Sequence, residues 1–466
     1  MTAIEARPAS GLHRAGLADE SAEPRMQVTG RVGLPKGAAM NTKLAMLGGS
    51  PAVTVDTQEQ WRRPVEKEKT AVCELIEEGY LSGSGEGLPR QFEEEFKAFI
   101  GCKYVLATSH GHTAIASAFF AAGLGAGDEF IHPTLGYLGS YAGALHMGAT
   151  PVFCEVDPKT LLADPADIER RIAPKTRVIN PIHTCGRVCD MDALLDVCKR
   201  RGLVLLEDAA HAHGSEWGGT KIGNLGHIAC FSMQGSTPGG KPVASGEGGL
   251  VATNDRELYE RALVYCHLHR SGAMEELRNP VYKQLDFQLL GWKWRAHPLA
   301  VAIAQVSLET LPYRLERYAA NRDELALAIA GTPGIELAHN YPKARASELY
   351  GGLRFLYQPE AVGGLTATDF CRAVQAEGVP MGGGGGRGLE HLRAIYTKDL
   401  PGLWGKGHAG PANIPLPRYQ QGDYPVSEGL AGRVLSLPGW IEAAPGVIQQ
   451  VALAIRKVVE QHRALL

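Results

Sequence analysis

The chain has 466 residues, of which 44% are hydrophobic and 21% are charged, and its formal net charge is −3. These values are typical of a globular protein of about two or three domains, and such a charge gives no sign of nucleic-acid or membrane binding. No apolar run approaches the roughly 20 residues that cross a bilayer. Among the nine cysteines, Cys185 and Cys189 are the only close pair. No second pair lies at zinc spacing, so we expect reduced thiols, no metal site and a cytoplasmic protein.

Residues 1–39 are rich in Ala, Gly, Pro, Arg and Glu and show no sustained periodicity. They also lack the apolar stretch of a secretory signal. We interpret them as a disordered N-terminal extension, because the segment after Met40 looks like a natural start.

From about residue 90, short apolar segments alternate with helical patterns. Strands are predicted at Tyr104–Ala107, Glu129–His132, Pro151–Glu155, Arg177–Pro181 and Leu203–Leu206. Helices are predicted between them at Gly111–Gly123, Tyr137–Met147, Pro165–Ile172 and Met191–Arg201. Two more strand-like segments follow without an intervening helix, at Ile228–Met233 and Leu250–Thr253. This α/β alternation predicts a mostly parallel sheet with helices on both faces.

The C-terminal part begins with a long helical stretch from His297 to Ile329, in which Pro312 marks a possible break. A strand is predicted at Leu353–Tyr357, and helices at Ala367–Glu377, Leu389–Tyr396 and Val447–His462. We therefore expect an N-terminal segment and large domain over 40–296, a bridging helix over 297–330 and a small α+β domain over 331–466. The five glycines of Gly382–Gly386 must form a loop, either a flexible connector or one whose backbone approaches a ligand.

Lys241 is the most informative residue, because it lies alone in the small-residue run FSMQGSTPGGKPVASGEGG, residues 231–249. A lysine in this setting suits a Schiff base with a carbonyl cofactor. The run Gly235–Lys241 also has the G-x-x-x-x-G-K pattern of a phosphate loop, but that motif requires Ser or Thr next, and here Pro242 follows. A lysine in a solvated surface loop is the third interpretation.

Polar residues follow several of the predicted strands, at the edge of a parallel sheet where ligands bind. A glycine turn that leads into a helix at Gly111 suits an anion such as phosphate. Asp208 suits a cationic ring nitrogen, and Lys241 suits an aldehyde. These three groups, a phosphate, a ring nitrogen and an aldehyde, are the ones that pyridoxal phosphate carries.

With these features, the chain resembles the DegT/DnrJ/EryC1/StrS sugar aminotransferases of the aspartate aminotransferase (fold type I) superfamily. The resemblance runs from about Met40 to the C-terminus and rests on motifs in the family's order: GLGAGDEFIHPTLGY, GATPVFCEVDPKTLLADP, RVINPIHTCGRVCDMDAL, LLEDAAHAHGSEWGGTKIGNLGHIACFSM and GEGGLVATND. It implies pyridoxal 5'-phosphate as cofactor, the α/β fold described above, and a homodimer whose active sites share residues across the interface.

The resemblance also implies a role for individual residues. Lys241 would hold the cofactor as a Schiff base and act as general base. Asp208 would pair with the pyridine nitrogen, although a helix N-cap is the ordinary role of such a residue. Tyr137 would stack on the ring, unless it packs in the core, and His211 would lie beside the cofactor. The phosphate would be bound by Gly111, His112, Thr113 and Ser232.

Three further positions concern the substrate and the partner subunit. His183 lies on the expected substrate side, and a buried, hydrogen-bonded histidine is an equally ordinary interpretation. Lys293 stands where many family members have an Asn that reaches the partner subunit's phosphate, and a lysine there adds positive charge. Arg295 keeps the family's arginine position and is assigned to the substrate.

The chain departs from the family pattern in two loops. Nine residues instead of the usual five separate Phe231 from Lys241, which indicates a four-residue insertion at Thr237–Gly240. The segment Met381–Gly388 replaces a loop that usually shapes the sugar site.

The resemblance implies an aminotransferase that moves an amino group from glutamate or glutamine to a keto-sugar, a ketocyclitol or a related natural-product intermediate. The alternatives are another pyridoxal-phosphate reaction on the same fold, by elimination or bond formation, and a catalytically silent regulatory or scaffold paralogue. Relatives that dehydrate sugars replace the lysine with His, so Lys241 favours the aminotransferase.

Overall fold

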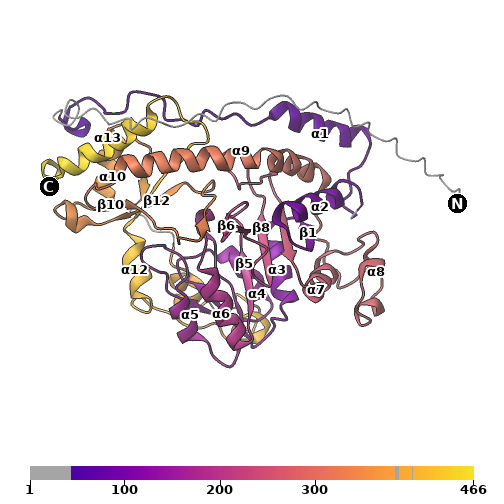
Figure 1. Ribbon diagram of the computed structural model, residues 1–466. Coiled ribbons are helices and arrows are strands. Elements are labelled where there is room, and N and C mark those ends of the chain that lie inside the picture. Colours follow the sequence, from indigo (N-terminus) through magenta and orange to yellow (C-terminus); the bar gives the residue numbers. More distant parts are fainter. Residues whose placement is uncertain (1–42, 85, 384–387, 401) are drawn as a thin grey trace. The chain divides into compact units, whose positions relative to one another are not determined.

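The computed structural model describes residues 43–84, 86–383, 388–400 and 402–466 (Figure 1). The expected extension over 1–39 and the last three glycines of the run 382–386 lie outside these residues, whereas Gly382 and Gly383 form a short strand, so the expected loop is wrong for these two glycines. In the described part, a seven-stranded sheet has the order β1-β9-β8-β5-β4-β2-β3. Its strands are β1 (Tyr104–Thr108), β2 (Glu129–Pro133), β3 (Thr150–Cys154), β4 (Thr176–Ile179), β5 (Val204–Asp208), β8 (Ile228–Ser232) and β9 (Gly249–Thr253). Only β9 runs opposite to the others, which confirms the mostly parallel sheet.

Two smaller antiparallel sheets accompany the main one. The first has the order β10-β12-β14-β13 and is formed by β10 (Ile335–Leu337), β12 (Leu353–Tyr357), β14 (Val434–Leu437) and β13 (Gly382–Gly383). The second has the order β11-β6-β7 and is formed by β11 (Ala344–Arg345), β6 (Glu216–Trp217) and β7 (Thr220–Lys221).

Helices cover the sheets and connect the strands. They are α1 (Val65–Glu77), α2 (Leu88–Ile100), α3 (Gly111–Ala121), α4 (Ala142–His146), α5 (Pro165–Arg171), α6 (Met191–Arg201), α7 (Arg256–Cys266), α8 (Ala273–Glu276), α9 (Pro298–Ile329), α10 (Ala367–Ala376), α11 (Ala394–Thr397), α12 (Pro425–Ala431) and α13 (Val447–Glu460). The sequence reasoning did not place α1, α2, α7, α8 or α12. In the described part of the chain, none of the helices has the length and apolar character needed to cross a membrane.

Successive side chains of a strand point to opposite faces of the sheet, and in the main sheet the side chains on both faces are apolar, so both faces are buried. On β5, Leu205 belongs to one core cluster and Leu206 to the other. On β8, Phe231 and Cys230 divide in the same way. Helix α3 is apolar nearly all round, which is typical of a fully buried helix, and it packs against β8, β9, α4 and α7.

The long helix α9 runs unbroken through Pro312, so the expected break is wrong. Pro312 is exposed, and water can therefore satisfy the carbonyl that the proline leaves without an N–H donor. Figure 1 shows α9 extending from α1 and α2 at one end to α13 at the other, and it contacts all three helices.

Two predicted helices are each interrupted in the structure. The segment 137–147 forms a 3-10 turn at Leu138–Ser140 and then α4, because Tyr141 leaves the helical conformation (φ −146°, ψ 0°). The segment 389–396 likewise divides into a 3-10 turn at Glu390–Leu392 and α11, with Arg393 extended between them. Both interruptions lie beside the pocket described below.

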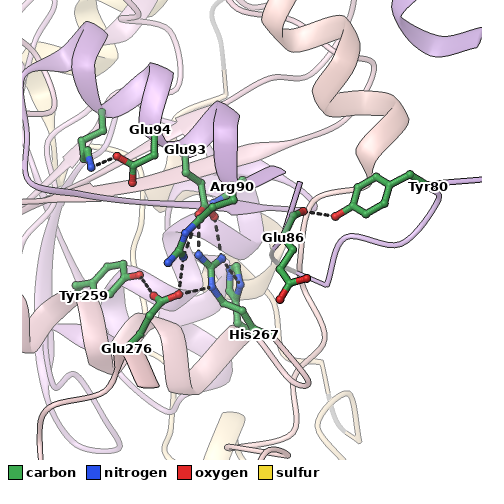
Figure 2. Close-up of polar contacts among 11 residues, drawn as sticks. Tyr80, Glu86, Arg90, Glu93, Glu94, Tyr259, His267 and Glu276 are labelled. Atoms are coloured by element: carbon green, nitrogen blue, oxygen red, sulfur yellow. Dashed lines mark hydrogen bonds and ion pairs between the residues drawn. The ribbon is translucent and has the colours of Figure 1, made fainter. Parts of the chain in front are cut away.

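A buried ion network ties α2 to the segment that follows α7 (Figure 2). Glu93 of α2 accepts hydrogen bonds from two guanidinium nitrogens of Arg270 at 2.7 and 2.9 Å, and from the backbone N–H of Ala107 in β1 at 2.8 Å. Burial alone would lower the pKa of Arg270, but the Glu93 carboxylate outweighs it and raises that pKa. Glu276 lies 3.4 Å from Arg270 and also accepts from Tyr259. The network therefore fixes the end of β1, from which the loop to α3 departs.

Candidate active site

A cavity of about 690 Å³ opens at the carboxyl ends of the parallel strands. It is lined by the loops that follow β2, β4, β5 and β8 and by the N-terminus of α3. Most of the predicted site residues line it together: Gly111, His112, Tyr137, Asp208, His211, Ser232 and Lys241. The others lie outside the lining: Thr113, His183, Lys293 and Arg295.

The expected insertion before Lys241 folds out as a closed turn. The backbone N–H of Lys241 donates to the carbonyl of Gln234 at 3.0 Å, and Gly240 N–H donates to Ser236 at 2.6 Å. Only glycine fits at residue 240, because a Cβ there would lie 2.5 Å from the backbone nitrogen of Ser236. The chain thus leaves the sheet at Gln234 and returns beside it, so the extra residues do not carry Lys241 away from the pocket.

The Lys241 side chain is held from two sides. It is only 7% exposed, and its Nζ lies 3.7 Å from the ring centroid of Tyr350. On the backbone side, the buried guanidinium of Arg314 in α9 donates to the carbonyl of the next residue, Pro242, at 2.7 Å. A buried amine against an aromatic face is unlike a lysine in a solvated surface loop.

Asp208 ends β5 and is buried, with its carboxylate facing the cavity lining. Its Oδ1 accepts the backbone N–H of Ala210 at 3.0 Å, and no helix begins there, so the N-cap interpretation does not apply. Both backbone groups of Asp208 are hydrogen bonded to the segment after β4: its N–H donates to the carbonyl of Pro181 and its carbonyl accepts from the N–H of His183, each at 3.0 Å. The sheet therefore sets the position of this carboxylate.

The N-terminus of α3 offers an anion site at one end of the cavity. Gly111 packs against Ser232, because a Cβ on Gly111 would lie 2.7 Å from the Ser232 Cβ. The positive end of the helix dipole and the Ser232 hydroxyl thus meet at one place, which suits a phosphate. The Thr113 hydroxyl is already engaged, since it donates to the carbonyl of His110 at 2.8 Å and accepts its N–H at 3.1 Å.

Two aromatic side chains lie beside these groups. Tyr137 is 57% exposed, which is inconsistent with core packing and suits a ring that a ligand covers. The His211 ring lies 4.4 Å from the Tyr350 ring, and its Nδ1 accepts the backbone N–H of Cys185 at 3.1 Å. In the neutral ring, Nε2 of His211 therefore carries the proton.

His183 is fully buried and contacts Glu207, the residue that precedes Asp208 on β5. Its Nδ1 accepts the backbone N–H of Cys189 at 3.2 Å, so Nε2 carries the proton and donates to Glu207 at 3.3 Å. Glu207 also accepts from the backbone N–H of Gly226 at 2.5 Å. The structure thus places His183 in a buried hydrogen-bonded pair, and its substrate role stays a prediction that the cavity lining does not support.

Lys293 and Arg295 lie on the segment that passes beside β1. Lys293 is exposed and forms an isolated β-bridge with His267, whereas Arg295 bridges Thr108 and donates to the carbonyl of His269 at 3.2 Å. Burial and the nearby Arg270 lower the pKa of Arg295. Neither side chain lines the cavity of its own chain, so their roles toward the partner's cofactor and the substrate stay predictions.

The sequence reasoning missed several lining residues that come from distant parts of the chain. Tyr350 precedes β12, and Arg393 precedes α11. Neither residue carries a local motif, and a tertiary arrangement brings both to the cavity. Glu247 also lines the cavity, and its place in the GEGG motif is a local signal from which it could have been predicted.

The residues present fit pyridoxal phosphate. Lys241 supplies an amine for the aldehyde, Asp208 a carboxylate for the ring nitrogen, and α3 with Ser232 a cradle for the phosphate. The fold and this cavity define a fold type I enzyme of the aminotransferase kind. The family model of the DegT/DnrJ/EryC1/StrS aminotransferases matches residues 63–379, so the chain belongs to this family of pyridoxal-phosphate-dependent aminotransferases.

Similar proteins support the assignment. A protein of Micromonospora echinospora, whose name proposes an L-glutamine:3-amino-2,3-dideoxy-scyllo-inosose aminotransferase activity, is 32% identical over 346 residues, covering 74% of this chain and 80% of that protein. The L-glutamine:2-deoxy-scyllo-inosose aminotransferase of Streptomyces paromomycinus is 39% identical over 227 residues, covering 48% and 52%. The crystal structure of S. venezuelae DesV, in complex with a ketimine intermediate, superposes with a TM-score of 0.69 at 26% identity, covering 85% of this chain and 95% of that one.

Proposed function

We propose that this protein transfers the amino group of L-glutamine, or of glutamate, to the ketone of a ketocyclitol or a keto-sugar. The observation that carries the proposal is the placement of Lys241, Asp208 and the α3 N-terminus around one cavity. The names of the two relatives above support glutamine as donor and an inosose as acceptor.

Each side chain would contribute one function. Bound pyridoxal phosphate supplies an electron sink for the carbon that loses its proton. Lys241 would bind the cofactor's aldehyde through Nζ and, once released, would use the same atom to move a proton. Asp208 would keep a proton on the ring nitrogen, because a buried carboxylate favours a nearby positive charge. Tyr137 and His211 would orient the ring from the sides, and Ser232 with Gly111 would hold the phosphate.

We also propose that the enzyme is a homodimer in which Lys293 reaches the partner's phosphate. The segment around Lys293 exposes large apolar side chains, which on a soluble protein indicate an interaction surface: Val281, Phe287, Leu290 and Trp292. Mixing inactive Lys241→Ala and Lys293→Ala proteins should restore part of the activity through hybrid dimers. No recovery at all would contradict the shared site. The nine free cysteines support a reducing, cytoplasmic location.

The proposal is tested with L-glutamine labelled with ¹⁵N at the α-amino group. The label should appear as an amine on scyllo-inosose, 2-deoxy-scyllo-inosose or a nucleotide-linked keto-sugar, as measured by mass spectrometry. Label that stays on the α-amino acid with every ketone, or elimination of water from a sugar without nitrogen transfer, would contradict it.

A further inference from the structure

Arg393 forms part of the cavity wall and is held rigidly there. Its side chain is 35% exposed, and its Nε and Nη2 both donate to the carboxylate of Glu390, the latter at 2.7 Å. Glu390 is fully buried and also accepts a hydrogen bond from Tyr141 at 2.8 Å. Within the described ranges, Nη1 of Arg393 makes no hydrogen bond. The fork on Glu390 thus preorganises the guanidinium and leaves one nitrogen for a ligand.

The segment that carries Arg393 is anchored beside β2, whereas Ser232 of the phosphate cradle lies at the end of β8. Glu390 is fixed to the loop after β2, because its N–H donates to the carbonyl of Thr134 at 2.7 Å. Ser232 ends β8, and both β5 and β4 lie between β8 and β2 in the sheet. Three strand spacings separate the two ends by about 14 Å. The anchor of the Arg393 segment is thus well separated from Ser232, which favours a second anionic group as the partner of Arg393.

The charges of the two substrates decide which group that is. With a ketocyclitol as acceptor, which the names of the two relatives support, only the donor is anionic, since glutamine and glutamate carry a carboxylate on the carbon that bears the amino group. Hydrogen bonds between a guanidinium and a carboxylate are among the stronger ones in proteins, and in a confined site they also fix orientation. Of the described residues, two carboxylates line the cavity, those of Asp208 and Glu247, and Glu247 lies 4.0 Å from His110 beside the α3 N-terminus.

We propose that Arg393, positioned by Glu390 and Tyr141, binds the α-carboxylate of the amino donor. This inference rests on the proposed function, since it requires an α-amino acid as donor. It explains why the 389–396 segment departs from a continuous helix at Arg393: the extended residue directs the side chain into the cavity wall.

The test compares two donors that differ only in the carboxylate, L-glutamine and L-glutaminol. Donor turnover is measured with a saturating ketone for wild type, Arg393→Lys and Arg393→Gln. We expect KM for glutamine to rise by about ten- to a hundredfold in both variants, the usual effect of losing a charge-assisted hydrogen bond. KM for glutaminol should stay within about twofold. The lysine variant keeps a positive charge beside Glu390, and its thermal unfolding and cofactor absorbance report whether it folds.

A matched control is Arg433→Gln, which removes an arginine that also forks onto a glutamate, Glu360, but on the surface outside the cavity. It should change neither KM. An unchanged KM for glutamine in the Arg393 variants, an equal rise for both donors, or a rise only for the ketone would overturn the inference while the proposed function stands. If wild type transfers nitrogen from no α-amino acid, the proposed function fails, and the inference fails with it.

Discussion

The ring of Tyr350 lies 3.7 Å from Nζ of Lys241 and covers the amine from the side of β12. The contact joins two residues more than a hundred positions apart, and a second ring in contact with Tyr350, that of His211, also lines the cavity. An ammonium on an aromatic face gains about 0.5–2 kcal/mol, depending on its desolvation. Tyr350 therefore stabilises the charged form of Lys241 and holds its Nζ in the cavity.

Replacing Tyr350 by Leu should make the neutral amine of Lys241 more available. In cofactor-free protein, the pH profile of Lys241 labelling by an amine reagent should move to lower pH, and the rate at a fixed pH below the midpoint should rise by about two- to thirtyfold. Tyr350→Phe keeps the ring and should behave like wild type. Peptide mass spectrometry locates the label. A larger maximum rate with an unmoved midpoint would indicate better access only and would count against the cation–π contact.

The substitution Asp208→Asn should leave the cofactor bound but nearly inactive. The neutral amide cannot stabilise a proton on the ring nitrogen. Loss of one such electrostatic interaction in an active site typically lowers the rate by about a hundredfold or more. The kcat for nitrogen transfer checks this result, with cofactor content measured in parallel. A kcat within about threefold of wild type would remove Asp208 from the reaction.

His213 predicts a specific pH dependence of stability. It is fully buried between Phe96 and Phe231, and burial, with the nearby charges of Lys241 and Arg314, lowers its pKa to about 3. Below about pH 6.5 the His213 side chain binds a proton in the unfolded chain but stays neutral in the folded chain. As the pH falls from about 6.5 to about 3, this group should therefore lower the free energy of unfolding by about 1.4 kcal/mol per pH unit.

Replacing His213 by Leu should flatten that dependence. Neither ring nitrogen has a hydrogen-bond partner among the described residues, so the apolar side chain should cost little at pH 7. The measurement is the denaturation midpoint as a function of pH, with the exposed His339→Leu as control. Equal slopes for wild type and His213→Leu between about pH 4 and 6 would show that His213 is not kept neutral.

Two neighbouring glutamates of α2 should differ sharply in their effect on stability (Figure 2). Glu93→Gln removes the carboxylate that pairs through two contacts with the buried Arg270 and leaves Glu276, at 3.4 Å, as its counter-charge, which should cost about 3 kcal/mol. Glu94 is 58% exposed and pairs with Lys97 on the surface, so Glu94→Gln should cost less than about 0.5 kcal/mol. The shift of the urea midpoint distinguishes the two. Comparable shifts would mean that the buried network does not anchor β1.

Local signals were enough to predict part of this molecule. The sheet and the residues at its strand ends, such as Asp208 and Ser232, followed from periodicity and from the direction of parallel strands. Tyr350 and Arg393 could not be predicted, because their place in the cavity depends on how the C-terminal segments pack. The effect of the insertion was also beyond sequence reasoning, since it depends on a turn that closes between Gln234 and Lys241. Pro312 was misjudged because solvent exposure, invisible in the sequence, makes a proline tolerable in α9.

The central claim is that Lys241 carries the cofactor, and reduction followed by peptide mapping tests it most directly. Protein loaded with pyridoxal phosphate is treated with borohydride, digested and analysed by mass spectrometry. We predict a phosphopyridoxyl group on Lys241, and loss of both this group and the visible absorption band in Lys241→Ala. A label on another lysine, or no label on a protein that still transfers nitrogen, would contradict the account.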